Sequence, residues 1–285
     1  MFADIALAAR IEHSETHLLI AASAEIARRR GDSHDGFAAP LAGGVATYTG
    51  PGSPLNKVAG LGFGGPLAET ELDAIERSFA ERNCPVQVEL STLADPTLGQ
   101  LLTRRGYVLM NFENVLGVSL AEPRHSADTD SSASPKLSAR AIAIDNCAPA
   151  QFETWLNVVA TGFAAPDTEG VPSHESFDRA ELDRVIRDMA TAPGFMHYLA
   201  CRDGANAGGA SMFIGAGVAH LAGAATLPAH RRRGVQTALL AHRLRDARER
   251  GCEVAVVTTQ PGSKSQQNAQ RRGFELIYSR AVLVK

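Results

Sequence analysis

Residues 226–240 read TLPAHRRRGVQTALL, and the rest of the chain is organised around this stretch. A β-like run ends at Leu227 and Pro228, three arginines follow at 231–233, and Gly234 precedes a run with apolar residues at helical spacing. The first backbone N–H groups of a helix have no partner inside the helix, and the helix dipole makes that end positive. A glycine there lets the backbone come close to a ligand. The stretch therefore predicts a binding site for phosphate or pyrophosphate.

Two further features give the stretch a family resemblance. The pattern P-x-x-R-x-x-G-x-Q at 228–236 resembles the acyl-CoA pyrophosphate loop of the GNAT acyltransferase superfamily, Q/R-x-x-G-x-G/A. Arg231 and Gly234 match this loop, whereas Gln236 stands where the family prefers Gly or Ala. A strand-like run at 254–259 and PGSKSQQNAQRRGF at 261–274 then resemble the family's last helix, which ends in a Gly–Phe pair. The resemblance covers roughly the C-terminal half of the chain.

The resemblance implies an α/β (α+β) fold, in which a mixed, mostly antiparallel sheet is flanked by helices. It also implies acetyl-CoA as the co-substrate and no metal. In such a site the pantetheine lies along the strand before the loop, and the pyrophosphate lies on the loop and the following helix. The residues expected to bind the co-substrate are Ala225, Thr226, Leu227, Arg231, Arg232, Arg233, Gly234, Val235, Gln236, Thr237 and Asn268.

Composition limits the remaining function classes. A chain of 285 residues with 45% hydrophobic content favours two globular domains. A net charge of −3 argues against general nucleic-acid or anionic-membrane binding, so we expect a small-molecule partner. The four cysteines form no metal-binding spacing, and no window reaches membrane-spanning length. Charged residues interrupt any N-terminal leader, so we expect a cytoplasmic protein, either a monomer or a homodimer.

Apolar periodicity and turn residues predict the order of elements. Predicted helices span 14–30, 68–82, 95–105, 149–163, 178–191, 235–250 and 263–272. Predicted strands span 45–49, 58–63, 86–91, 107–120, 137–144, 195–202, 207–214, 217–227, 253–259 and 274–284. We expect the first two strands to form an antiparallel pair. The Ser-, Asp- and Pro-rich stretch 121–136 reads as a linker.

The two halves repeat one another. E-R-N-C at 81–84 corresponds to E-R-G-C at 249–252, an offset of 249 − 81 = 168. R-R-G-Y at 104–107 corresponds to R-R-G-F at 271–274, an offset of 271 − 104 = 167. Short identities in one order with a nearly constant offset indicate tandem copies. We therefore expect one domain at 1–120, the linker at 121–136 and a second domain at 137–285.

Only the second copy keeps the anion loop. The offset of 168 places Phe63, Gly64 and Gly65 opposite the three arginines, and Pro66 opposite Gly234. Proline lacks an N–H, and the glutamates at 69 and 71 would repel a phosphate. The first copy is thus predicted to lack a CoA site. We expect it to support the second copy and to form one wall of the acceptor site. Each copy also ends one strand early for the family, so we expect the two sheets to complete each other.

The sequence does not identify the catalytic residues. Members of the family often carry a tyrosine acid four residues before the Gly–Phe pair, but that position is Ala269 here. The leaving thiolate could then depart unassisted or take a proton from water, Ser265 or Tyr278, and Tyr278 also reads as an ordinary strand aromatic. His220 is a candidate base, with a water chain and a core histidine as alternatives. The loop at 164–178 is where the family closes over its acceptor.

Three functions fit the sequence. The leading one is an acyl-CoA-dependent N-acyltransferase that transfers an acyl group directly to a small amine. The alternative is a non-catalytic acyl-CoA-binding sensor or regulatory module, which Ala269 and the degenerate first copy favour. The third, a nucleotide-phosphate binder unrelated to CoA, leaves the ordered C-terminal resemblance unexplained.

Overall fold

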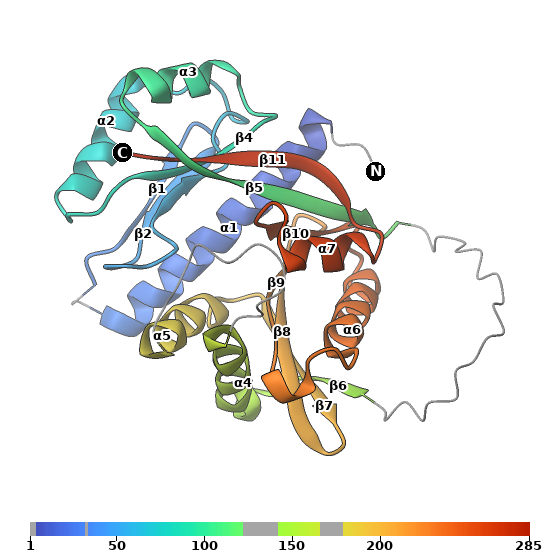
Figure 1. Cartoon of the computed structure of the whole chain (residues 1–285). Coiled ribbons are helices and arrows are strands. Elements are labelled where there is room, and N and C mark those ends of the chain that lie inside the picture. Colours follow the sequence, from blue (N-terminus) through green and yellow to red (C-terminus); the bar gives the residue numbers. More distant parts are fainter. Residues whose placement is uncertain (1–3, 32–33, 122–141, 166–178) are drawn as a thin grey trace.

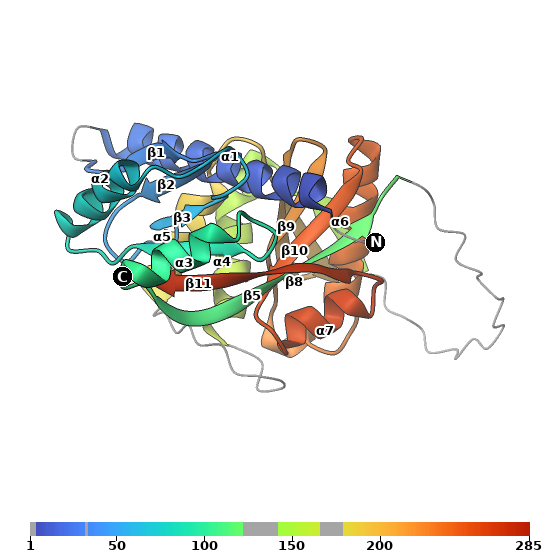
Figure 2. The same ribbon diagram turned by 90° about the horizontal axis from the view of Figure 1, so that it is seen from above.

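The computed structural model describes residues 4–31, 34–121, 142–165 and 179–285. These residues form one sheet with helices on both faces, and the strand order is β1-β2-β3-β4-β11-β5-β10-β9-β8-β7-β6 (Figures 1 and 2). The strands are β1 (Phe37–Leu41), β2 (Gly44–Tyr48), β3 (Lys57–Ala59), β4 (Gln87–Ser91), β5 (Val108–Ser119), β6 (Ile142–Asn146), β7 (Phe195–Arg202), β8 (Ala205–Gly215), β9 (Val218–Thr226), β10 (Val254–Thr259) and β11 (Glu275–Val284). The α-helices are α1 (Ile5–Arg30), α2 (Glu69–Ala80), α3 (Thr97–Arg104), α4 (Phe152–Ala164), α5 (Arg179–Ala190), α6 (Val235–Glu249) and α7 (Lys264–Gln270).

Strands β5 and β11 exchange places between the two halves. β11, from the C-terminal half, lies between β4 and β5, whereas β5, from the N-terminal half, lies between β11 and β10. Figure 1 shows the two strands crossing the centre of the molecule side by side, and they are antiparallel. The sheets of the two halves therefore complete each other, as the sequence predicts, and they do so by forming one continuous sheet.

The pairing of β5 with β11 is symmetric about its centre. Its two ends are the pairs Glu275–Gly117 and Val284–Val108, and the offset of 167 converts each pair into the other. At the centre lies the pair Glu113–Arg280, whose two residues are related to each other by the same offset. The internal repeat thus appears in the structure as an approximate twofold relation, and Glu113 and Arg280 lie on its axis.

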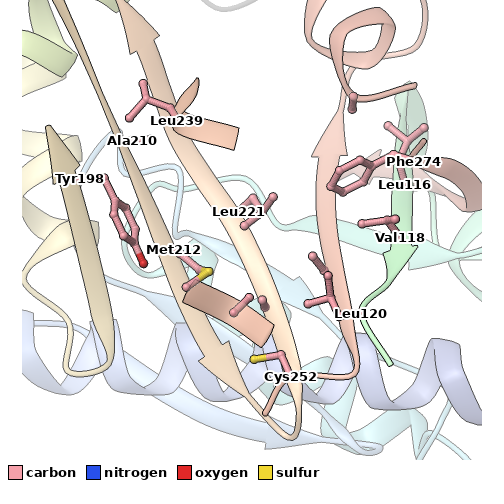
Figure 3. Packing of buried hydrophobic residues seen from close by; sticks show 14 of the residues in the cluster. Leu116, Val118, Leu120, Tyr198, Ala210, Met212, Leu221, Leu239, Cys252 and Phe274 are labelled. Atoms are coloured by element: carbon pink, nitrogen blue, oxygen red, sulfur yellow. The ribbon is translucent and has the colours of Figure 1, made fainter. Parts of the chain in front are cut away.

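The hydrophobic core also joins the two halves. Leu116, Val118 and Leu120, at the end of β5, pack in one cluster with Leu239 of α6 and Phe274 (Figure 3). On the opposite face of the sheet, Val218, Val254 and Val256 pack against Ala8 and Ile11 of α1. The first half therefore supplies both a strand and a helix to the core of the second.

The first helix is longer than the sequence predicts. It begins at Ile5 and not at Ser14, because the carboxylate of Asp4 accepts a hydrogen bond from the Leu7 N–H at 2.7 Å and caps it. Ser14 is buried inside the helix, where its hydroxyl donates to the carbonyl of Gly215 at 3.0 Å. The predicted cap is therefore a contact between the first helix and the second copy.

The other predicted elements agree with the structure to within a few residues. The sequence missed β1, whose Pro40 lowers strand propensity and which lies at the edge of the sheet. The first two predicted strands correspond to β2 and β3, which are antiparallel.

All but the first residue of the linker 121–136, and the start of the strand predicted at 137, lie outside the described residues. No helix in the described part of the chain is long and apolar enough to cross a membrane.

Candidate active site

The loop between β9 and α6 has the backbone conformation of an anion site. Arg232 and Gly234 both lie in the left-handed region, with φ of 59° and 84°. Within the described ranges, the backbone N–H groups of Gly234, Val235, Gln236 and Thr237 have no hydrogen-bond partner. No acidic residue lies in the first turn of α6. This end of α6 therefore presents unpaired donors and the positive end of a helix dipole.

The three arginines of this loop have different surroundings. The guanidinium of Arg231 donates to the carbonyl of Gly162 at 3.3 Å and to that of Ala165, at the end of α4. It thereby ties the loop to the helix across the sheet, in a position where a cation also complements the helix dipole. Arg232 and Arg233 are exposed beside the unpaired N–H groups.

A fourth arginine, which the sequence analysis missed, lies at the same loop. Arg272 donates to the hydroxyl of Thr237 at 2.8 Å, in the first turn of α6. Its equivalent in the first copy, Arg105, faces Glu69, Asp73 and Glu76 on α2. The first copy thus neutralises this cation with carboxylates, whereas no carboxylate partner of Arg272 is found in the described part of the second copy. The repeat R-R-G-Y/R-R-G-F is the signal that could have identified it.

Strands β9 and β10 separate next to the loop. Their parallel pairing covers only the stretch from Val218–Val254 to His220–Val256. Beyond it, β9 has a bulge at Gly223, whose φ is 56°, and the register against β8 shifts. Among the described residues, the backbone groups of β9 that face β10 beyond this point have no strand partner. They are available to pair with an extended ligand.

Two buried hydroxyls lie at the ends of the separated strands. Thr226, the last residue of β9, and Thr259, the last of β10, are 8% and 5% exposed. Among the described residues neither Oγ1 atom has a hydrogen-bond partner. Buried polar groups are normally paired, so these two hydroxyls are candidates for contact with a polar ligand. Thr226 belongs to the predicted set, whereas Thr259 was missed because its run reads only as a core strand.

The comparisons with known proteins agree with this geometry. Residues 162–274 match the family model of the acetyltransferase (GNAT) family. This segment is similar to a GNAT acetyltransferase domain. No curated protein matches the chain at a significant level.

Solved structures place the whole chain in the same fold. A GCN5-related N-acetyltransferase from Kribbella flavida is similar with a TM-score of 0.66 and 21% identity, over 98% of this chain and 95% of that one. A GCN5-related N-acetyltransferase from Sphaerobacter thermophilus has a TM-score of 0.53 and 15% identity, over 100% and 94%. A tandem GNAT protein from the clavulanic acid biosynthesis pathway has a TM-score of 0.56 and 14% identity, over 85% and 78%. At these identities the likeness shows the fold, which is that of a tandem GNAT protein.

The candidate base and acids of the GNAT domain lie in different environments. His220 is half-buried on β9, and desolvation lowers its pKa to about 4. Its Nε2 atom has no hydrogen-bond partner in the part of the chain that the structure describes. Tyr278 is 4% exposed, and its hydroxyl donates to Glu12 at 2.6 Å. Burial raises the pKa of Tyr278, so this hydroxyl is a poor proton donor.

The remaining candidates lie on α7, next to the separated strands. Ser265 is exposed in the first turn, and Asn268 is half-buried one turn later. Ala269 is 6% exposed and packs in the core with Phe274, so no acid replaces the family's tyrosine at that position. Residues 166–178 of the loop expected to close over the acceptor lie outside the described residues. Among the described residues no cluster of three His, Cys, Asp or Glu side chains could hold a metal.

Proposed function

We propose that the protein is an acetyl-CoA-dependent N-acetyltransferase that acts on a small amine, with one co-substrate site per chain. The observation that carries this proposal is the combination of the unpaired N–H groups at Gly234–Thr237 with the separation of β9 from β10. The first feature fits a diphosphate and the second fits an extended pantetheine arm. Their succession along one strand and one helix matches the shape of CoA. Bound there, acetyl-CoA would supply an acyl thioester.

The residues of the site would divide the work as follows. Gly234 to Thr237 would bind the diphosphate through their N–H groups, with Arg232, Arg233 and Arg272 supplying positive charge. Ala225, Thr226 and Leu227 would line the pantetheine arm, and Asn268 would contact it from α7. The β9 backbone at the bulge would donate an N–H to the oxyanion. With Ala269 in the acid position, water or Ser265 would supply the proton for the leaving thiolate.

The domains would have separate roles. We propose that residues 137–285 form the CoA-binding domain and residues 1–120 form a domain that has lost this site. Pro66 and the two first-turn glutamates of α2 support the loss, because they remove a donor and add negative charge. The loop before α2 also lacks the arginine cluster. A cytoplasmic location, and a monomeric or homodimeric state, stay predictions.

A free-thiol release assay tests the proposal. The purified protein and acetyl-CoA would be mixed with a panel of amines, amino acids and aminoglycosides, and CoA thiol would be measured against time. We expect turnover with at least one acceptor, and none for Gly234→Pro. Gly234→Pro removes a donor N–H and a positive φ from the loop. Calorimetry in parallel separates the alternative, because a sensor module would bind CoA and show no turnover with any acceptor.

A further inference from the structure

A buried group of charged side chains lies where the two copies meet, on the face of the sheet covered by α1. Its centre is Arg280 on β11, which is 1% exposed. The Nε atom of Arg280 lies 2.7 Å from Glu12, and its Nη2 atom contacts Glu15. Its Nη1 atom lies 3.8 Å from both Glu89 and Glu113. Four carboxylates from α1, β4 and β5 therefore surround one guanidinium.

The group carries more carboxylates than cations. Lys57 on β3 is the second cation, and its Nζ lies 2.8 Å from Glu89. The neutral groups facing the cluster are Tyr278, which donates to Glu12, and His220, whose low pKa leaves it uncharged near neutral pH. With every carboxylate ionised, the cluster would hold two more negative than positive charges. A desolvated site with such an excess must retain protons or receive a cation.

The four carboxylates are not equivalent. Burial alone would raise the pKa of Glu15, but Arg280 and Lys57 outweigh it and lower the pKa to about 2. Burial raises the pKa of Glu12, which is 1% exposed. Burial and the negative charge of Glu89 raise the pKa of Glu113 to about 7. The side chain of Glu113 is 30% exposed, against 2% for Glu89 and 14% for Glu15. Glu113 is therefore the end of the cluster that is open to solvent.

Strand register places Glu113 beside the separated strands of the GNAT domain. On β5, Asn114 pairs with Thr259, the last residue of β10, so Glu113 lies one residue beyond the end of β10. Its side chain lies on the same face as those of Val115 and Thr258, which pair across the two strands, and Thr258 is exposed. β10 ends at Thr259, after its pairing with β9 has stopped at His220–Val256, so Glu113 lies at the level where β9 and β10 have separated.

We propose that Glu113, contributed by the degenerate N-terminal copy, is the general base of the acetyl transfer in the C-terminal GNAT domain. The inference rests on the proposed function, and it adds that the acceptor is a cationic amine, attracted by the excess of carboxylates. The Glu113 carboxylate takes one proton from the bound ammonium, directly or through one water, and later releases it to solvent. The neutral amine nitrogen then attacks the thioester carbonyl carbon. A C–N bond forms, the C–S bond breaks, and the second nitrogen proton reaches the departing thiolate through water or Ser265.

The central test compares Glu113→Gln with the wild-type protein. Glutamine keeps the size of the side chain and cannot take the proton, so we expect acetyl transfer to fall by about 10²- to 10⁴-fold. The acceptor would be the best amine of the panel, and acetyl-CoA hydrolysis without any amine gives a second rate that needs no known acceptor. Glu253→Gln removes the same charge at a surface ion pair with Arg10 and should leave both rates unchanged. Calorimetry with CoA verifies that each variant is folded and binds.

The pH profile separates a base from a structural residue. The base works when it is deprotonated, so kcat/KM should rise with pH through the pKa of Glu113, near 7. The Glu113→Gln variant should not show this rise. Glu89→Gln removes a charge that raises the pKa of Glu113, so the rise in kcat/KM should move to lower pH. Difference infrared spectra should show a carboxyl group titrating near pH 7 in the wild-type protein that is absent from Glu113→Gln, whether or not an acceptor is known.

The outcomes are distinguishable. Bound acetyl-CoA with equal rates in Glu113→Gln and wild type, or no titrating carboxyl lost from the infrared spectrum, would overturn the role of Glu113 and leave the proposed function standing. Failure of acetyl-CoA and CoA to bind would overturn the proposed function and this inference together. A rise in kcat/KM with pH that is lost in Glu113→Gln and moved to lower pH in Glu89→Gln would support both the proposed function and the role of Glu113.

Discussion

Gly234 offers a quantitative test of the anion loop. Its φ is 84°, and a Cβ added there would meet only the Cδ1 atom of Ile142, at an ordinary 3.7 Å. Gly234→Ala therefore introduces backbone strain without a clash. An L-residue held in the left-handed conformation costs about 1–2 kcal/mol, whereas the free loop can relax to negative φ and avoid this cost. Binding would have to restore the strained conformation, because only there do the N–H groups converge on the diphosphate.

We expect the dissociation constant for CoA to rise by about 5- to 30-fold. This rise corresponds to a loss of about 1–2 kcal/mol of binding free energy, at 1.4 kcal/mol per tenfold change. Calorimetry with CoA measures it directly. Gly251→Ala is the matched control, because Gly251 follows the opposite end of α6, has a φ of 76° and has nothing within 4 Å of an added Cβ. Equal affinity in folded Gly234→Ala and wild type, or an equal loss in Gly251→Ala, would show that the loop conformation does not bind the diphosphate.

Further predictions concern the two copies. Arg272→Ala should weaken CoA binding in calorimetry, because it removes a cation beside α6. Arg105→Ala should lower the melting temperature and leave the CoA affinity unchanged. The reverse pattern would place the diphosphate elsewhere. Titration of the intact chain should give one CoA site, and two equivalent sites would refute the degeneracy of the first copy. Residues 137–285 expressed alone should aggregate, because β5 is missing between β10 and β11; a soluble fragment with wild-type kinetics would refute this. Tyr278→Phe should lower turnover by less than about 10²-fold, since its hydroxyl is bound to Glu12, and a larger loss with CoA affinity intact would make Tyr278 the acid.

Local patterns in the sequence were sufficient to predict most elements. The runs that became β4, β10 and β11 carry apolar residues at strand spacing, and turn residues such as Gly251 and Gly273 end the elements before them. The start of α1 was misplaced, because a capping-like Ser14 is indistinguishable in sequence from a buried serine that bonds to a distant carbonyl. β1 was missed because an edge strand with a proline has little local signal.

The arrangement of the candidate site needed tertiary information. The anion loop is contiguous, so its residues could be named from the sequence. Thr259 and Glu113, in contrast, become part of the site through the register of β5 against β10, which pairs residues more than a hundred positions apart. The offset between the copies did hold one usable clue, because it places a glutamate, Glu113, opposite an arginine, Arg280. Only the exchange of strands brings these two residues together.

The exchange of β5 and β11 also determines when the protein can finish folding. Ribosomes release the N-terminal half first, and domains commonly fold as they emerge. Here β4 and β5 are synthesised early but are separated in the sheet by β11, the last strand of the described fold. The first half therefore cannot close its sheet until the final residues of β11 are available. Neither copy has a complete fold of its own, so chemical denaturation should proceed as a single cooperative transition of the whole chain. Refolding should be slow, because it depends on pairing between strands far apart in the sequence.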